Sequence, residues 1–129
     1  NDVSERSFQL ATTQWDKGKG CDTFAPIGPW LVTTDEIADP QKLEIWLDVN
    51  IDRMQTGNTR DMIFSVRQIV SHVSHFMTLL PGDIIATGTP AGVGMGRKPE
   101  PVFLKPGDVM TLSIRGLGEQ RQKVIAYKG

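Results

Sequence analysis

Hydrophobic and polar residues alternate most regularly along residues 43–50. Every second side chain there is apolar, namely Leu43, Ile45, Leu47 and Val49. A period of two predicts a strand with one buried and one exposed face. Residues 53–56 follow after a short turn and are predicted to pair with this strand as a hairpin. The turn carries Asn50, Ile51 and Asp52, without the Asn-Gly pair that favours a tight type I′ turn.

Residues 64–77 follow a helical pattern. Apolar residues recur there at intervals of three and four, in Val66, Ile69, Val70, Val73, Phe76 and Met77. This spacing predicts one long helix with a buried apolar stripe. Ser65 and Gln68 form the S-x-x-Q sequence of a capping box, and Phe64 and Ile69 have the spacing of a hydrophobic staple. We therefore predict the N-cap of this helix at Ser65.

Shorter patterns predict the remaining elements. Further strands are expected at residues 30–33, 84–87, 109–115 and 122–127. A short helix is expected from residue 4 to about residue 10, with Ser4 as its N-cap. Many strands with one main helix predict an α+β domain with mainly antiparallel or mixed sheets. All 129 residues fit one small domain.

Composition excludes several classes of function. The chain has 14 basic and 15 acidic residues and a net charge of −1, so no charge excess points to nucleic acid or to an anionic membrane. We find neither a signal-peptide pattern nor an apolar run long enough to span a membrane. Cys21 is the one cysteine, which excludes an internal disulfide and is compatible with a reducing compartment. We expect a cytoplasmic protein.

Candidate chemistry gathers in the first part of the chain. Asp2 stands in a short polar segment, and Lys19 stands between Gly18 and Gly20. Glycines beside a lysine let the backbone approach a ligand closely and supply positive φ where a bend needs it. A carboxylate and an ammonium in one pocket suit an anionic substrate held on a divalent cation, because hard metals prefer carboxylate oxygens and a lysine stabilises negative charge. The alternative is that Asp2 caps a turn and Lys19 is a solvated loop charge.

Two other patterns do not support a site. His72 and His75 are three residues apart, but a pair lacks the third ligand of a catalytic zinc site, and we predict them at the surface or at an interface. Residues 88–98 are rich in glycine, but Gly96 is followed by Arg97 and no helical pattern follows, so neither nucleotide-binding fingerprint fits. A mobile or tightly turned loop beside the site is the better interpretation.

Several motifs follow one another along the chain in a characteristic order. The first comprises Asn1, Asp2, Val3, Ser4, Arg6 and Gln9, and the second runs from Gln14 to Trp30 through Gly18, Lys19, Asp22, Thr23 and Phe24. Later motifs lie at residues 55–64, 80–83, 87–94 and 103–108. Together they cover nearly the whole chain, and the set resembles the fumarylacetoacetate hydrolase family.

The resemblance implies roles for individual residues. Asp2 matches the family's metal-ligating aspartate, Lys19 its active-site lysine, and Thr23 a threonine near the metal. Gln9 and Thr89 match residues that contact substrate, Thr89 by binding a carboxylate. The implied cofactor is a divalent metal, with Mg²⁺ first and Mn²⁺ or Ca²⁺ as alternatives.

Three further positions matter for the comparison with the family. Ser7 stands where the family usually has aspartate, which would remove the partner of a nearby base. Gly20 stands where the family usually has serine or threonine, which would loosen the lysine loop. Arg6 matches an arginine that we interpret as a structural ion-pair residue.

The resemblance also implies a fold and a reaction. The fold would be the family's mixed β-sandwich roll, within the α+β class, and the protein would be a homodimer. The implied reaction is hydrolysis of a carbon–carbon bond in a 2,4-diketo acid such as an acylpyruvate, giving pyruvate or a related 2-oxo acid and a carboxylic acid. A lyase, decarboxylase or isomerase acting on a related oxo acid would use the same metal-stabilised enolate. Residues 94–99 and 116–122 resemble the family's diketo-deoxysugar-acid hydrolases, and proteins called ureidoglycolate lyases share this resemblance.

The chain begins at Asn1, already inside a motif. The resemblance places about as much sequence again upstream, with a Glu-x-Glu pair that completes the metal site and a His/Glu dyad that activates water. We therefore expect residues 1–129 to be the C-terminal portion of one catalytic domain, which needs its upstream half. A second hypothesis is that the chain alone is inactive and serves as a structural or oligomerisation module.

Overall fold

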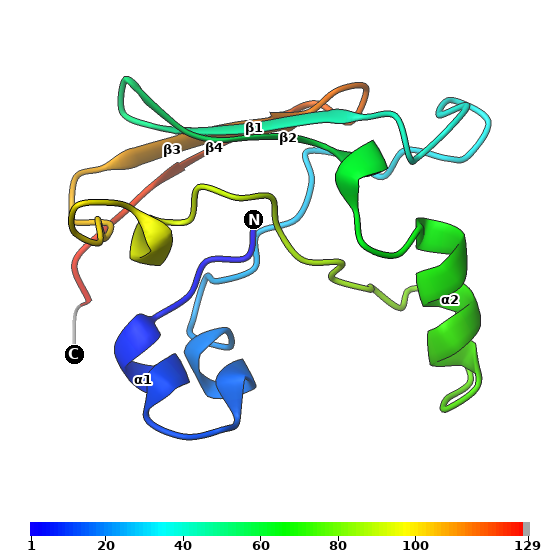
Figure 1. Cartoon of the computed structure of the whole chain (residues 1–129), viewed down its shortest axis with the longest axis horizontal. Coiled ribbons are helices and arrows are strands. Elements are labelled where there is room, and N and C mark those ends of the chain that lie inside the picture. Colours follow the sequence, from blue (N-terminus) through cyan, green and yellow to red (C-terminus); the bar gives the residue numbers. More distant parts are fainter. Residues whose placement is uncertain (128–129) are drawn as a thin grey trace.

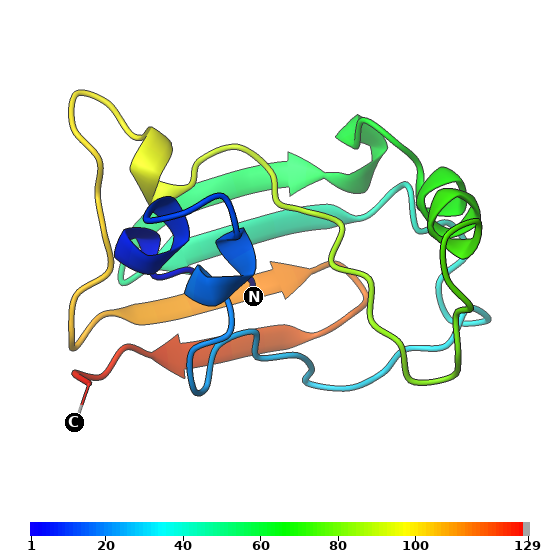
Figure 2. The same cartoon turned by 90° about the horizontal axis from the view of Figure 1, so that it is seen from below.

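The computed structural model describes residues 1–127. The elements in chain order are α1 (Arg6–Leu10), the 3₁₀ helix η1 (Trp15–Gly18), β1 (Glu44–Val49), β2 (Asp52–Asn58), the 3₁₀ helix η2 (Thr59–Asp61), α2 (Val66–Ser74), the 3₁₀ helix η3 (Gly94–Gly96), β3 (Val109–Ile114) and β4 (Glu119–Lys123). The helices all lie on one side of the sheet (Figure 1). Seen from below, α1 and η1 lie beneath β1 and β3, and α2 lies beyond one end of the strands (Figure 2). The predicted α+β class with one main helix is confirmed.

The sheet has four antiparallel strands in the order β2-β1-β3-β4. Its register pairs Ile45 with Ile114, Leu47 with Leu112 and Val49 with Met110, so the alternating apolar residues of β1 and β3 share one face. Among the described residues, Met110 is the one buried hydrophobic side chain, with 6% of its surface exposed. The Asn1 amide contacts the Met110 sulfur and donates to Gln122 Oε1 at 3.1 Å, so the N-terminal segment lies against this face. The alternation predicted for residues 43–50 and 109–115 is confirmed.

The hairpin between β1 and β2 contains two irregularities. Val49 pairs with Asp52, which leaves Asn50 and Ile51 in the turn. Only Asn50 has positive φ, at 57°, so the turn is not type I′, which needs positive φ at both positions. The register shifts after Leu47, and Met54 becomes the extra residue of a β-bulge.

Helix α2 begins where the capping box predicts. The Ser65 hydroxyl accepts from the Gln68 backbone N–H, and the Gln68 side chain accepts from the Ser65 N–H at 2.9 Å. The helix ends at Ser74, three residues before the predicted end, because the next turn tightens and the His75 N–H donates to the His72 carbonyl. Within the described part of the chain, no helix is long and apolar enough to cross a membrane.

Removal of the α2 cap should lower the stability of the fold. We expect Ser65→Ala to cost about 1 kcal/mol in the free energy of unfolding, because the Gln68 N–H loses its acceptor. Ser74→Ala is the matched control, since this hydroxyl donates only to the Ser71 carbonyl at the other end of the same helix. Chemical denaturation measures both, and equal midpoints for the two variants would contradict a stabilising role for the cap.

Several predicted elements do not form as expected. Residues 30–33 and 84–87 are not strands, because no described segment pairs with them, and Leu31 is 93% exposed. The last strand is β4 and begins earlier than the predicted residue 122, because a tight turn at residues 116–118 follows β3 directly.

Helix α1 is capped by a different residue from the one predicted. Glu5 is the N-cap, and its carboxylate accepts from the Ser7 backbone N–H at 3.0 Å and from the Ser7 hydroxyl at 2.6 Å. These hydrogen bonds lower the pKa of Glu5. The Ser4 hydroxyl donates to the Asp2 carbonyl and does not cap the helix.

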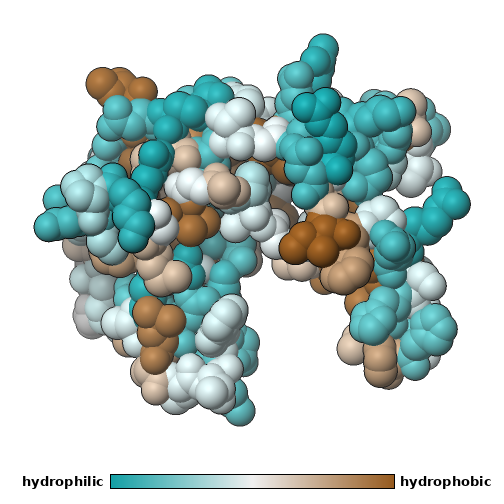
Figure 3. Space-filling model, viewed as in Figure 1, coloured by the Kyte–Doolittle hydropathy of each residue, from teal (hydrophilic) through white to brown (hydrophobic). Residues whose placement is uncertain are grey.

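Most large apolar side chains of the described chain remain at the surface. The predicted apolar stripe of α2 is not buried, since Val70 is 42% exposed and Phe76 is still more exposed. Large apolar side chains lie on both sides of a hollow between the part that holds α1 and the part that holds α2 (Figure 3). A second hollow between residues 28–32 and the sheet is lined by Trp30, Leu112 and Leu117. An apolar surface of this extent marks an interaction site.

Candidate functional site

The structure brings Asp2 and Lys19 together. The Lys19 ammonium lies 2.6 Å from Asp2 Oδ2, and the two side chains are 31% and 46% exposed, respectively. Asp2 precedes α1, and Lys19 directly follows η1. The pair therefore joins two loops whose positions are 17 residues apart.

Gly18 makes this approach possible. A β-carbon at position 18 would lie 2.6 Å from the Gln9 β-carbon and 2.7 Å from the Glu5 carbonyl oxygen, so only glycine fits. The Glu5 N–H donates to the Gly18 carbonyl at 2.8 Å, which fixes η1 against α1. The sequence suggested close approach to a ligand at the glycines beside Lys19, whereas the close approach in the structure is that of Gly18 to Glu5 and Gln9 of the same chain. Gly20 differs, since its nearest neighbour would be the Asp16 carbonyl at 3.5 Å, an ordinary contact that leaves room for serine.

Gln9 is the one buried polar residue in the part of the chain that the structure describes. It is 4% exposed, lies against Gly18, and its Oε1 accepts from the Arg6 guanidinium. Arg6 thus bonds to an amide and not to a carboxylate, which differs from the structural ion pair expected for it. A buried amide with a charged donor is held firmly in place.

Thr23 lies in the loop that follows Lys19. It has φ of 65°, and Ala25 has φ of 52°. A β-branched residue in the left-handed region is a genuine outlier, and such strain costs about 1–3 kcal/mol for each residue. The Phe24 N–H donates to the Cys21 carbonyl at 3.0 Å, which closes a turn around Thr23. The structure thus places Thr23 at the surface of a tight turn shortly after the lysine.

Thr89 lies at the start of the glycine-rich loop and is held by strand β2. Gln55 Nε2 donates to the Thr89 hydroxyl at 2.7 Å and to the Pro90 carbonyl at 2.8 Å. A β-carbon at Gly57 would lie 2.6 Å from the Pro90 β-carbon, so glycine in β2 makes room for the proline. Thr89 is therefore attached to β2 by a hydrogen bond. Asp2 has a different partner, Lys19.

The rest of residues 88–98 also packs on β2. A β-carbon at Gly92 would collide with the Met54 carbonyl, and one at Gly94 would collide with the Val102 carbonyl. Arg97 Nη2 donates to the carbonyls of Arg53 and Met54, each at 3.1 Å. Gly92 and Gly94 thus allow close contact with the chain's own backbone, in agreement with the interpretation as a turned loop.

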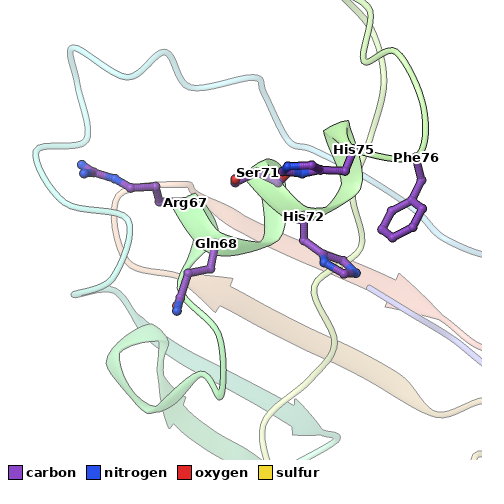
Figure 4. Close-up of a pocket in the computed structure, with 6 residues that line it drawn as sticks. All are labelled: Arg67, Gln68, Ser71, His72, His75 and Phe76. Carbon is purple, nitrogen blue, oxygen red and sulfur yellow. The ribbon is translucent and has the colours of Figure 1, made fainter.

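His72 and His75 line a shallow, open pocket on α2, together with Arg67, Gln68, Ser71 and Phe76 (Figure 4). The His72 ring packs edge to face on Phe76 with ring centroids 5.0 Å apart. His75 Nδ1 lies 2.6 Å from the Ser71 carbonyl. The rings point in different directions (Figure 4), so they do not present a common metal-binding edge.

Asp2 is the metal-ligand candidate that the family resemblance selects. Among the residues that the structure describes, no group of three or more His, Cys, Asp or Glu side chains could hold a metal ion. A hard divalent cation needs about six oxygen ligands, although Mg²⁺ often takes only one or two from carboxylates. Asp2 can therefore serve as one protein ligand of a metal ion, but the described residues do not supply a complete metal site.

Gln55 and Gly57 are candidate site residues in addition to those that the sequence predicts. A glycine inside a strand signals a bulge or a close backbone approach. Gly57 lies within β2 and contacts Pro90, so this signal was present in the sequence. The partner of Gln55 could not be read from the sequence, because the two residues of the hydrogen bond are 34 positions apart.

The curated proteins that are similar to this chain are about twice as long as the chain. A protein of Burkholderia cenocepacia (strain HI2424) that is named only as a hydrolase is 62% identical over 124 residues, which are 95% of this chain and 44% of the relative. The chain thus spans less than half the length of the curated relatives it matches.

Solved structures show the same fold. Fumarylacetoacetate hydrolase from Exiguobacterium antarcticum matches 98% of this chain and 45% of its own, with 46% identity and a TM-score of 0.94. Maleylpyruvate hydrolase from Sphingobium sp. SYK-6, in complex with manganese(II) and pyruvate, matches 84% of this chain and 38% of its own, with 44% identity and a TM-score of 0.74. A 2-hydroxyhepta-2,4-diene-1,7-dioate isomerase from Mycobacterium marinum matches 97% and 45%, with 45% identity and a TM-score of 0.83.

The family model described as fumarylacetoacetate hydrolase C-terminal matches residues 1–125. This match covers nearly the whole chain and includes Asp2, Lys19 and Thr89. The chain belongs to the fumarylacetoacetate hydrolase family.

Proposed function

We propose that this chain is the C-terminal portion of a metal-dependent hydrolase that cleaves a carbon–carbon bond in a 2,4-diketo acid such as an acylpyruvate. The single observation that carries the proposal is the Asp2–Lys19 contact of 2.6 Å, which puts a ligand for a hard cation beside a compact ammonium. Two structurally similar proteins support the substrate class, since one is a maleylpyruvate hydrolase with bound manganese and pyruvate, and another acts as an isomerase on a related dioate.

Asp2 would be one ligand of Mg²⁺, or of Mn²⁺, and the remaining carboxylate ligands would come from sequence outside this chain. When bound, the metal supplies Lewis-acid polarisation of the 2-oxo acid end of the substrate. Asp2 is half-exposed, so one face of its carboxylate is open to such a ligand set. With Asp2 engaged there, the Lys19 N–H groups become free for the substrate.

Lys19 would stabilise the negative charge that develops as the bond breaks. In the overall reaction, water adds to the distal carbonyl, the carbon–carbon bond breaks, and its electron pair passes to the 2-oxo acid fragment as an enolate. A proton then converts this enolate to pyruvate or a related acid, while the other fragment leaves as a carboxylic acid. The packing of Gly18 on α1 fixes the backbone beside Lys19, and a donor on a fixed backbone stabilises such charge with less reorganisation.

Thr89 and Gln9 would contact the substrate, and Thr23 would lie near the metal. The Thr89 hydroxyl is exposed on the glycine-rich loop and suits a carboxylate. Gln9 is buried beneath the lysine loop, so it would act from the floor of the site. Thr23 lies in the tight turn after Lys19.

The apolar surface of the chain supports the proposal that a further segment completes the domain. Trp30, Phe76 and Ile84 are large and exposed, and the hollow beneath the sheet separates α1 from α2. The relatives are about twice as long as this chain, which matches the need for a covering segment. We further propose a homodimer, which the family resemblance implies, and a cytoplasmic location, with which the single cysteine of this chain is compatible. The alternative of an inactive structural module applies to the chain without that segment.

The test is turnover by the protein that contains both this chain and the completing segment. We expect acetylpyruvate to give pyruvate and acetate with Mg²⁺ or Mn²⁺, and to lose this activity with EDTA. Proton NMR of the products measures the outcome and separates hydrolysis from isomerisation or decarboxylation, while this chain alone serves as the control. Turnover that is unaffected by EDTA, or products without pyruvate and acetate, would contradict the proposed reaction.

A further inference from the structure

We infer that Gln55 is a positioning residue that holds the Thr89 hydroxyl as a hydrogen-bond donor toward the carboxylate of the substrate. The inference rests on the proposed function, in which Thr89 binds that carboxylate. It concerns a residue of strand β2 that would not itself touch the substrate.

The orientation of the Gln55 amide is fixed by its second partner. Its Nε2 lies 2.8 Å from the Pro90 carbonyl oxygen, and a carbonyl can only accept a hydrogen bond. The group that faces Pro90 is therefore the NH₂ and not the amide oxygen. The same NH₂ reaches Thr89 Oγ1 at 2.7 Å, so its second hydrogen points to the hydroxyl.

The direction of the hydrogen bond between Gln55 and Thr89 determines whether the Thr89 hydroxyl can donate to a further group. A threonine hydroxyl has one hydrogen to donate and two lone pairs that accept. Since Gln55 donates into one lone pair, the Thr89 hydrogen is free for another acceptor, and a carboxylate is an acceptor only. A donor in this position also polarises the hydroxyl and strengthens the bond that it donates.

Gln55 lies in a strand, whereas Thr89 lies in a loop. Gln55 pairs with Leu47 in the hairpin. Gly57 completes the arrangement, because it lets Pro90 pack directly on β2. Sites that are held by regular elements are more precise than sites on loops.

Arg97 offers a matched control for the effect of attaching the glycine-rich loop to β2. It binds the same loop to β2 through the carbonyls of Arg53 and Met54, and none of its hydrogen bonds in the described part of the chain is to Thr89. A variant at Arg97 therefore weakens the attachment of the loop and leaves the hydroxyl bond in place. If Gln55 only holds the loop, the variants at both positions should have the same effect.

The experiment uses the protein with its completing segment, loaded with Mn²⁺, and calorimetric titration with pyruvate and with methyl pyruvate, whose ester replaces the carboxylate. We expect Thr89→Val to weaken pyruvate binding by about tenfold to a hundredfold, as loss of a bond to a charged group does. Gln55→Met should weaken it by about tenfold, in the range in which contacting residues couple. Methyl pyruvate should bind these variants and the unaltered protein alike.

The double variant Gln55→Met, Thr89→Val provides the decisive comparison. We expect it to bind pyruvate as Thr89→Val does, because the proposed effect of Gln55 on pyruvate passes through that hydroxyl, while its bond to the Pro90 carbonyl only holds the loop. Arg97→Met should leave the ratio of pyruvate to methyl pyruvate affinity unchanged. Independent losses in the double variant, or an equal loss of this ratio in Arg97→Met, would overturn the role of Gln55. Absence of acetylpyruvate turnover in the unaltered protein would instead overturn the proposed function.

Discussion

Asp2→Asn should abolish metal-dependent turnover in the protein that contains the completing segment. The substitution keeps the shape of the side chain but removes the charge, and a hard cation binds a neutral amide oxygen far more weakly than a carboxylate. Loss of the negative charge also leaves Lys19 without the partner that lies 2.6 Å away. We expect Mn²⁺ affinity to fall together with kcat, and calorimetric titration with Mn²⁺ measures the first without reference to activity.

Asp16→Asn is the matched control for Asp2. Asp16 lies in η1, three residues before Lys19, and its backbone carbonyl accepts from the Lys19 N–H. A substitution of its side chain leaves that bond in place, so Mn²⁺ affinity and kcat should stay close to those of the unaltered protein. If Asp2→Asn binds Mn²⁺ as tightly as Asp16→Asn does, Asp2 is not a metal ligand.

Lys19→Met should lower kcat by about a hundredfold to a thousandfold, the usual loss when one donor to a developing oxyanion is removed. Lys19→Arg should fail as well, because a planar guanidinium does not replace a compact ammonium next to Asp2 and Gly18. The loss should appear equally in kcat and in kcat/KM, which is the signature of an interaction made in the transition state. Steady-state kinetics with acetylpyruvate at several salt concentrations measures these effects.

A different result is expected if Lys19 only attracts the anionic substrate through its charge. In that case Lys19→Arg would retain activity, and Lys19→Met would raise KM with a strong dependence on salt. Lys17→Met serves as the control, since Lys17 is an exposed cation in η1 of the same loop. An unchanged kcat in Lys19→Met would leave the lysine as a binding charge only.

Elements with local signals could be predicted from the sequence. The alternation of β1 and β3 and the capping box of α2 depend on neighbours within a few residues, and both are present. Residues 30–33 and 84–87 have the composition of strands, but a strand forms only with a partner, and no described segment supplies one. The cap of α1 was misassigned to Ser4 because Glu5 can also accept from the first turn, and local sequence does not decide between them.

The contacts of the candidate site could be predicted from the sequence less completely than the secondary structure. The residue types and the resemblance placed Asp2 and Lys19 in one pocket, whereas their direct contact and the packing of Gly18 on Gln9 are seen only in the structure. The attachment of Thr89 to Gln55 depends on how a long loop folds back on a strand. Such contacts between distant positions leave only weak local signals, in this case Gly57.

The two outer strands of the sheet have a further consequence for the behaviour of the chain in solution. An unprotected outer strand can pair with a strand of a second molecule and so nucleate aggregates. In β2 the bulge at Met54 interrupts the ladder and Arg97 occupies two carbonyls, while β4 exposes the charged residues Glu119, Arg121 and Lys123. Extension of the sheet from molecule to molecule is thus blocked at both sides. Loss of solubility in the isolated chain should therefore start from its apolar surfaces, and a charge introduced at Phe76 should remedy it better than one introduced in β4.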